Sequence, residues 1–214
     1  MRTVELFCGT KSFSKIMYEK GHDTFTVDND PSFVPTLTAS VLDMDDGMIP
    51  YRVELLWASP PCEGFSVASI GANWRGGYRA YIPKSDTARR SIALATRTIE
   101  IIEATKPRYW FIENPRGLLR KMPFMEEFLE RSGGIRHTVT YCQYGDTRMK
   151  PTDIWTNALW WTPKPPCKNG QPCHVAAPRG SKTGTQGISG YKDRSRIPSA
   201  LFEEILEQYA IRVV

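Results

Sequence analysis

The order of elements in residues 4–28 places the strongest constraint on the fold. Residues 4–7 form a mostly apolar run that predicts a strand, residues 13–20 have the spacing of an amphipathic helix, and residues 22–27 form a second, mixed run that predicts another strand. Gly9 lies in the turn after the first run, and Asp28 follows the second. Two strands joined by a helix pair in parallel, because the helix returns the chain to the same end of the sheet. The sequence therefore predicts an α/β fold around a parallel sheet.

This order of strand, glycine turn, helix, strand and acid is typical of a nucleotide-binding unit. A carboxylate at the end of the second strand, here Asp28, can hydrogen-bond ribose hydroxyls. The glycine signal is short, because Gly9 stands alone without a full G-x-G-x-x-G pattern. An ordinary βαβ unit with an acidic loop therefore remains an open alternative.

A cysteine follows two prolines at the end of another apolar run, residues 53–58. Pro60 and Pro61 stiffen the backbone where this strand ends. Ligands of open α/β sheets bind at the carboxyl ends of the strands, so the thiol of Cys62 is both positioned and accessible, as a nucleophile must be. The alternative is a buried structural cysteine, which would not require a rigid Pro-Pro turn.

Two more apolar runs, residues 39–42 and residues 109–112, predict further strands that also end in polar residues. Asp43 follows the first of these runs, and Glu113-Asn114 follows the second. Because carboxyl ends of parallel strands meet at one edge of a sheet, we expect the Glu113 carboxylate and the Cys62 thiol to face one cleft.

The remaining periodic segments are three helices and a hairpin. Helical spacing covers residues 86–105, 122–131 and 198–211. Residues 138–142 and 154–157 predict two strands, and the polar tip between them carries two cations, Arg148 and Lys150. Residues 70–79 combine glycines, aromatics and arginines without periodicity, which predicts a mobile loop that could meet bases and phosphates, or an ordinary surface loop.

The positive charge of the chain is concentrated in one segment. The 214 residues, which suit a single domain, carry a net charge of +5. Residues 160–196, rich in Pro and Gly, hold seven Lys or Arg and one Asp, so +6 lies there and −1 elsewhere. Localised charge favours a nucleic-acid surface. We therefore divide the chain into a catalytic part, residues 1–158 and 197–214, and a basic recognition segment, residues 159–196.

The cysteines indicate a reducing compartment. Their number is five, without paired spacing, which suits reduced thiols in the cytoplasm, and no apolar run approaches the roughly 20 residues of a membrane-spanning helix. The N-terminus is too short and too charged for a signal peptide. Cys167-x5-Cys173-His174 invites comparison with zinc sites, but the spacing is wide and a fourth ligand is not obvious, although Cys142 could reach. The default expectation is no metal, with unpaired thiols and a surface histidine.

Taken together, these segments resemble the DNA cytosine-5 methyltransferase family over nearly the whole chain. Residues 60–66, Pro-Pro-Cys-Glu-Gly-Phe-Ser, resemble its Pro-Cys-Gln-x-Phe-Ser motif, and residues 111–114, Phe-Ile-Glu-Asn, resemble its Glu-Asn-Val motif. Residues 5–9 are similar to the first motif, residues 144–150 to the basic hairpin, and residues 196–198 to the closing motif. The resemblance implies a Rossmann-like fold that uses S-adenosylmethionine and acts on DNA.

The resemblance also implies roles for individual residues. Catalytic residues would be Cys62, Glu113, Arg148 and Lys150, and cofactor-binding residues Phe7, Cys8, Gly9, Asp28, Asp43, Pro61 and Ser195. DNA-binding residues would be Ser66, Arg75, Arg179 and Lys182. A thiolate adds to carbon 6 of cytosine, an acid protonates ring nitrogen 3, and a hairpin cation holds the carbonyl oxygen. The target base must leave the duplex to reach such a site.

The chain departs from the family pattern at several positions. The family's paired glycines are Lys11-Ser12 here, its Gln is Glu63, its Val is Pro115, and its closing Asn is Ser195. Two other functions remain alternatives. An exocyclic-amine methyltransferase carries Ser-Pro-Pro-Tyr where residues 59–62 are Ser-Pro-Pro-Cys, and an inactive DNA-binding protein could retain the fold. Methylation of free nucleotides or RNA is a further, less favoured option.

Overall fold

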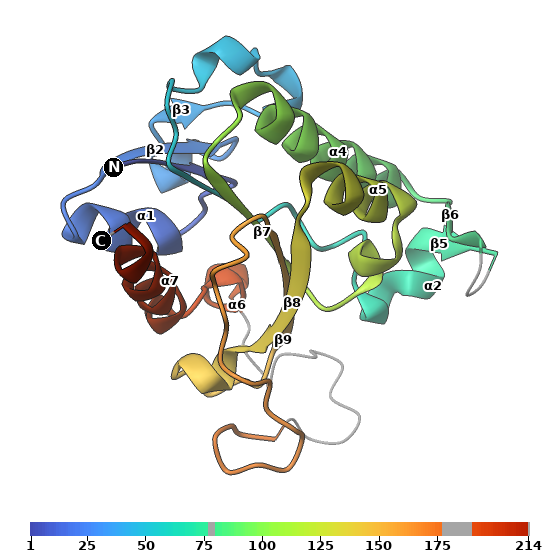
Figure 1. Ribbon diagram of the computed structural model, residues 1–214. Coiled ribbons are helices and arrows are strands. Elements are labelled where there is room, and N and C mark those ends of the chain that lie inside the picture. The colour runs from blue at the N-terminus through green and yellow to red at the C-terminus, as the bar shows by residue number, and fades with distance from the viewer. Residues whose placement is uncertain (77–79, 177–189, 214) are drawn as a thin grey trace.

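A seven-stranded sheet forms the centre of the molecule in this computed structural model, which describes residues 1–76, 80–176 and 190–213 (Figure 1). The strand order is β3-β2-β1-β4-β7-β9-β8. The strands are β1 (Arg2–Leu6), β2 (Asp23–Asp28), β3 (Leu37–Thr38), β4 (Leu55–Ala58), β7 (Tyr109–Pro115), β8 (Ile135–Thr140) and β9 (Pro151–Thr156). β1, β2, β3, β4 and β7 pair in parallel, whereas β9 is antiparallel to both of its neighbours.

Helices cover both faces of this sheet. α1 (Ser12–Glu19) and α7 (Ser199–Val213) pack together on one face, and α4 (Asp86–Thr105) and α5 (Pro123–Ser132) lie on the other (Figure 1). Side chains of β4 alternate between the two cores: Leu55 and Trp57 pack in the cluster with α1 and α7, and Leu56 and Ala58 pack in the cluster with α4 and α5. All four are fully buried, as expected for a central parallel strand.

Short elements complete the fold. They are the short helices η1 (Pro31–Phe33), η2 (Val41–Asp43), η3 (Asp46–Met48), η4 (Val67–Ser69), α2 (Ile70–Asn73), η5 (Leu118–Lys121), η6 (Tyr141–Tyr144) and α6 (Tyr191–Ser195), with the strand pair β5 (Trp74–Arg75) and β6 (Ile82–Pro83). Among the described residues, no helix is both long and apolar enough to span a bilayer.

The structure confirms the predicted α/β fold and most of its elements. The helix over residues 86–105 is present as α4, and the helices predicted over residues 122–131 and 198–211 appear as α5 and α7. Ser85 explains why α4 begins where it does, because its hydroxyl accepts a hydrogen bond from the Ala88 amide (3.0 Å).

Three local predictions are wrong. The third strand is Leu37–Thr38, not residues 39–42, because the Ser40 hydroxyl accepts from the Leu42 amide and starts the 3-10 helix η2. Glu113–Pro115 do not follow a strand but belong to β7, where pairing with β9 extends the strand through Pro115. Cys142 is part of η6, not of the strand predicted over residues 138–142.

The prediction of a loop over residues 70–79 is wrong for residues 70–75. These residues form α2 and β5, and β5 pairs with β6. Trp74 is buried and donates from its indole nitrogen to the Gly64 carbonyl (2.6 Å). The Asn73 side-chain nitrogen donates to the Glu63 carbonyl (3.2 Å). These side-chain contacts fold the segment back onto the turn after Cys62, so Trp74 is not available to stack on bases.

Candidate active site

The turn after β4 is fixed to the neighbouring strand β7. Asn114, fully buried in β7, donates from its side-chain nitrogen to the Pro60 carbonyl (2.9 Å). The Phe65 amide donates to the Cys62 carbonyl (3.0 Å), which closes the turn. Two prolines restrict the remaining backbone freedom. Cys62 is therefore half-buried at the carboxyl end of a central strand, held by bonds on both sides.

Glu113 is buried beside this turn. It is 5% exposed, and the Tyr141 hydroxyl donates to its Oε1 atom at 2.7 Å. Burial raises the pKa of the Glu113 carboxyl, against the opposing effects of the Lys150 charge and hydrogen bonds from Tyr141 and Ser59. A carboxyl with a raised pKa keeps a proton that it can give to a substrate.

The thiol and the carboxyl act on each other and on one cation. Burial raises the pKa of the Cys62 thiol, the Glu113 charge raises it further, and the Lys150 charge lowers it. Burial lowers the pKa of the Lys150 ammonium, whereas Glu113 raises it. The Lys150 Nζ atom lies 4.7 Å from the centre of the Tyr141 ring and donates to the Arg194 carbonyl (2.9 Å). Cys62, Glu113 and Lys150 therefore lie near enough for the charge of each to act on the others.

Arg148, the other hairpin cation, has a different set of contacts. Its side chain is 5% exposed and forms an ion pair with Asp146. Nε donates to the Asp146 carboxylate (2.9 Å), and the terminal nitrogens donate to the same carboxylate and to the carbonyls of three residues, Asp193, Arg194 and Arg196. These bonds occupy all five N–H groups of a guanidinium. Arg148 thus joins the hairpin to residues 193–196 at the end of the basic segment, a set of contacts that we call the Arg148 clamp. No N–H group of Arg148 is left for a substrate.

A cleft opens on the other side of β4, at the carboxyl ends of β1 and β2. It encloses about 400 Å³ of space, part of it open to solvent, and is lined by apolar side chains with a few polar groups: Phe7, Val27, Asp28, Asn29, Ala39, Ser40, Val41, Pro61, Arg90 and Leu94. The strand order reverses between β1 and β4, and ligands of open α/β sheets bind at such a switch point. The apolar walls suit a flat base, and a carboxylate at the rim suits sugar hydroxyls.

Asp28, Phe7 and Pro61 are thus three predicted cofactor residues that line one cleft. The Asp28 carboxylate accepts from the amides of Gly9 and Asp30, both at 2.9 Å, so it also shapes the turn after β1. Pro61 precedes Cys62, so the cleft and the thiol share one turn.

Other predicted cofactor residues lie outside the lining of this cleft. Cys8 is buried, and burial raises the pKa of its thiol to about 12. Asp43 is exposed at the end of η2, and Ser195 is exposed in α6, where its hydroxyl donates to the Lys192 carbonyl (2.9 Å). The Ile197 amide donates to the Ser12 hydroxyl (3.4 Å), which joins the closing motif to the start of α1. The roles of Cys8, Asp43 and Ser195 stay predictions.

The predicted DNA-binding residues are spread over the structure. Ser66 is half-buried at the start of η4, and Arg75 is exposed in β5. Arg179 and Lys182 lie outside the described residues. Three other cations of the basic segment, Lys192, Arg194 and Arg196, are exposed next to the Arg148 clamp.

Comparison with known proteins decides the family. Residues 1–130 match the family model described as C-5 cytosine-specific DNA methylase. The chain belongs to this family. The match covers both β1 with its glycine turn and the Cys62 and Glu113 segments.

Individual relatives extend the family match. The chain is similar to a protein of Frog virus 3 (isolate Goorha) named "Probable DNA (cytosine-5)-methyltransferase", with 29% identity over 97% of this chain and 99% of that protein. Among solved structures, it resembles Schizosaccharomyces pombe Dnmt2 methyltransferase (TM-score 0.53, 16% identity, 73% of this chain and 50% of that one). It also resembles Entamoeba histolytica methyltransferase EhMeth (TM-score 0.51, 12% identity, 73% of this chain and 52% of that one). The chain spans about half the length of these solved structures, and at such identities they show the fold alone.

One departure from the family's glycines has a visible consequence. Lys11, in place of a family glycine, adopts φ 58° and ψ 43° at the start of α1, a left-handed conformation that favours glycine. Its ammonium group donates to the Val34 carbonyl, a contact that a glycine could not make. In this chain a lysine, not a glycine, therefore takes the left-handed position at the start of α1.

The sequence did not single out two buried side chains that the structure places in polar contacts. Glu5 is 3% exposed in β1, where its carboxylate accepts from the Phe13 amide and from the Ser14 amide and hydroxyl, and burial raises the pKa of Glu5 to about 7. An acid inside the apolar run of residues 4–7 was the available signal. Tyr141, the partner of Glu113, lies 28 residues away, and no local pattern marks it.

Proposed function

We propose that this protein methylates carbon 5 of cytosine in DNA, with S-adenosylmethionine as the methyl donor. The observation that carries the proposal is the group formed by Cys62, Glu113 and Lys150 beside the cleft at the switch point. Membership of the C-5 cytosine-specific DNA methylase family and similarity to the named viral cytosine-5 methyltransferase support it. An exocyclic-amine methyltransferase or an inactive DNA-binding protein would give Glu113 no role.

The residues of the cleft fit the cofactor. Asp28 would bind the ribose hydroxyls, and the apolar side chains of Phe7, Val41 and Leu94 would enclose the adenine. When bound, S-adenosylmethionine supplies an electrophilic methyl group on its sulfonium. Pro61 would separate the cleft from the thiol, so the methyl group and the target base would meet across this turn.

Cys62 and Glu113 divide the work on the base. The Cys62 sulfur forms a bond to carbon 6, and the electron pair of the 5,6 double bond makes carbon 5 nucleophilic. Glu113 donates its proton to ring nitrogen 3, which removes the charge that would otherwise build up on the ring. Carbon 5 takes the methyl group and then loses its proton to a base. The carbon 6–sulfur bond breaks to return the Cys62 thiolate, and ring nitrogen 3 gives its proton back to Glu113.

Lys150, not Arg148, is the hairpin cation that can assist. Its charge stabilises the Cys62 thiolate and the Glu113 carboxylate, and it has donors beyond its bond to the Arg194 carbonyl. The Lys150 ammonium would hold the carbonyl oxygen of the flipped cytosine. Arg148 would position Lys150 by fixing the hairpin, since its own N–H groups are occupied.

DNA would lie over the basic segment, residues 159–196. Exposed Lys192, Arg194 and Arg196 next to Lys150 support this placement, and Arg179 and Lys182 remain predicted phosphate contacts. Neutralising Arg179 and Lys182 together should reduce the salt dependence of DNA affinity by about two phosphate contacts. The control is the neutralisation of Lys20 and Lys106 together. These are exposed cations before β2 and β7, at the amino ends of the strands.

Covalent trapping tests the proposed reaction. Duplex DNA of mixed sequence, with 5-fluorocytosine in place of cytosine, should form an adduct with the enzyme that survives denaturing electrophoresis and requires S-adenosylmethionine, because fluorine cannot leave as a proton does. Cys62→Ser should abolish the adduct, and Glu113→Gln should slow its formation while cofactor affinity stays nearly constant. Methyl transfer by Cys62→Ser, with no adduct from the wild-type protein, would show a different reaction.

A further inference from the structure

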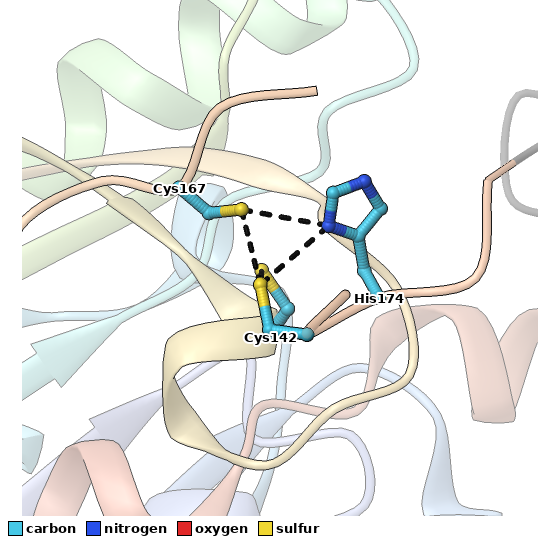
Figure 2. A group of neighbouring side chains, drawn as sticks. Cys142, Cys167 and His174 are labelled. Atoms are coloured by element: carbon cyan, nitrogen blue, oxygen red, sulfur yellow. Dashed lines mark hydrogen bonds between the residues drawn. The ribbon is translucent and has the colours of Figure 1, made fainter. Parts of the chain in front are cut away.

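Three cysteines and a histidine meet beside η6, in the connection between β8 and β9. The ligand atoms of Cys142, Cys167, Cys173 and His174 all lie within 4.8 Å of one another. Cys142 comes from η6, and the other three come from the basic segment. In Figure 2 the side chains of Cys142, Cys167 and His174 point toward a common centre.

Two hydrogen bonds donated by backbone amides, neither of which depends on a metal, bring these side chains together. The Cys167 amide donates to the Thr140 hydroxyl at the end of β8 (2.8 Å). The Val175 amide donates to the Thr147 carbonyl in the hairpin (2.9 Å). The chain from Cys167 to His174 is therefore held against η6 at both of its ends.

The distances match the edges of a small tetrahedron. Zn²⁺ binds sulfur at about 2.3 Å and nitrogen at about 2.0–2.1 Å, which places ligand sulfurs about 3.8 Å apart and sulfur and nitrogen about 3.5 Å apart. Cys173 Sγ lies 3.7 Å from Cys142 Sγ and 3.7 Å from His174 Nδ1, and Cys167 Sγ lies 3.5 Å from His174 Nδ1. The Cys167 and Cys173 sulfurs are 3.1 Å apart, closer than this ideal but well beyond the roughly 2.05 Å of a disulfide.

The surroundings also suit a metal. His174 is half-buried, and its Nδ1 atom faces the sulfurs of Cys167 and Cys173, whereas among the described residues its buried Nε2 has no hydrogen-bond partner. The Gln143 side-chain nitrogen approaches Cys173 Sγ at 3.6 Å, a contact that would neutralise part of the charge on a bound thiolate.

We propose that Cys142, Cys167, Cys173 and His174 bind one structural Zn²⁺ ion. Four protein ligands close the coordination shell, which is the mark of a structural rather than a catalytic zinc, and thiolate with imidazole is a ligand set that suits zinc. The ion would join the basic segment to the hairpin that carries Lys150, and so hold the proposed DNA surface in position before DNA binds. This inference goes beyond the methyl-transfer reaction and does not depend on it.

Metal analysis of the tag-free protein tests the site. The wild-type protein should retain one zinc per chain after exhaustive dialysis, and Cys173→Ser and His174→Ala should each lose at least tenfold in zinc affinity. Cys62→Ser and His22→Ala are the matched controls, and both should retain one zinc per chain. Co²⁺ in place of zinc should give the intense visible spectrum of a tetrahedral thiolate site in the wild-type protein and in the controls.

A second measurement uses the wild-type protein alone, in case the variants do not fold. Zinc should protect three of the five thiols from alkylation, identified by mass spectrometry as Cys142, Cys167 and Cys173, and a chelator should expose them. Wild-type protein that binds neither zinc nor cobalt, or three thiols that alkylate equally with and without zinc, would overturn the proposal. A Cys167–Cys173 disulfide in protein isolated under reducing conditions would do the same.

Discussion

Removing one oxygen atom from Tyr141 tests how Glu113 works. Tyr141 is fully buried, and its hydroxyl donates to Glu113 Oε1 at 2.7 Å. In Tyr141→Phe the ring stays, and with it the contact to the Lys150 ammonium at 4.7 Å. The Glu113 carboxylate then loses a hydrogen bond that favours its charged form.

The expected effect is a shift of the pH profile in one direction. The Tyr141 hydroxyl lowers the pKa of Glu113, so its removal raises this pKa, and the carboxyl keeps its proton to higher pH. A hydrogen bond to a charged group contributes about 1.5–3 kcal/mol, and a pKa shift of one unit corresponds to about 1.4 kcal/mol. The alkaline limb of the pH–rate profile should therefore move up by about one pH unit or more. If Glu113 is the acid that protonates the base, activity therefore persists to higher pH in the variant.

The assay is single-turnover methyl transfer to DNA between about pH 6 and about pH 10, where the rate reports groups in the bound complex. Tyr144→Phe is the matched control: Tyr144 belongs to the same short helix, but its hydroxyl donates to Glu204 (2.9 Å). We expect its pH profile to equal that of the wild-type protein. An alkaline limb that stays in place or moves down in Tyr141→Phe would refute the role of Glu113 as the acid, and so would an equal shift in the control.

Three further predictions concern cofactor binding, pH and packing. Asp28→Ala should weaken S-adenosylmethionine binding by about 1.5–3 kcal/mol, measured by calorimetry, whereas Asp23→Ala at the other end of β2 should leave it unchanged. The pKa of Glu5 is about 7 in the folded protein against 4.5 as its ordinary value, so its contribution to stability is complete below about pH 4.5 and is lost as the pH rises through 7. In the wild-type protein the free energy of unfolding, measured in urea, should fall between these pH values, and in Glu5→Gln this fall should be smaller by up to about 3 kcal/mol. An equal fall in both proteins would contradict the raised pKa of Glu5. Gly64→Ala should lose about 1–3 kcal/mol of stability, because the new methyl group would lie 2.5 Å from the Ser91 hydroxyl oxygen, and adding Ser91→Gly should recover part of that loss.

Most of the fold could be predicted because its signals are local. The apolar run, the glycine turn and the acid Asp28 lie within one βαβ unit, and the stripe of α4 is bounded by Ser85 and Pro107. The packing of residues 70–76 could not be predicted in this way, since it depends on the Trp74 indole reaching the Gly64 carbonyl, a contact between separate segments.

The candidate site likewise combines residues that local signals predicted with contacts that depend on distant segments. Cys62 and Glu113 each follow an apolar run, so their sequence positions predicted a shared cleft. The sequence could not predict that Lys150, and not Arg148, has N–H groups free for a substrate. The Arg148 guanidinium donates to backbone carbonyls more than 40 residues away, and no local pattern reveals these contacts. Cys142 is separated from Cys167 by 25 residues, so the sequence named it only as a residue that could reach the cluster, and its approach depends on β8 and the basic segment lying together.

The way the basic segment is attached has a consequence for how such an enzyme could acquire a new DNA target. Two attachments to the hairpin flank residues 177–189. On one side the Val175 amide donates to the Thr147 carbonyl, and on the other the carbonyls of Asp193, Arg194 and Arg196 accept from Arg148. The two attachment points are neighbours in the sequence of one hairpin. Joining two such points costs only about 0.6 kcal/mol more for each doubling of the connecting length. If the segment between them contacts DNA, as we propose, insertions, deletions or substitutions there would change this contact without changing the bonds that hold Cys62 and Glu113. The choice of target could then evolve separately from the chemistry.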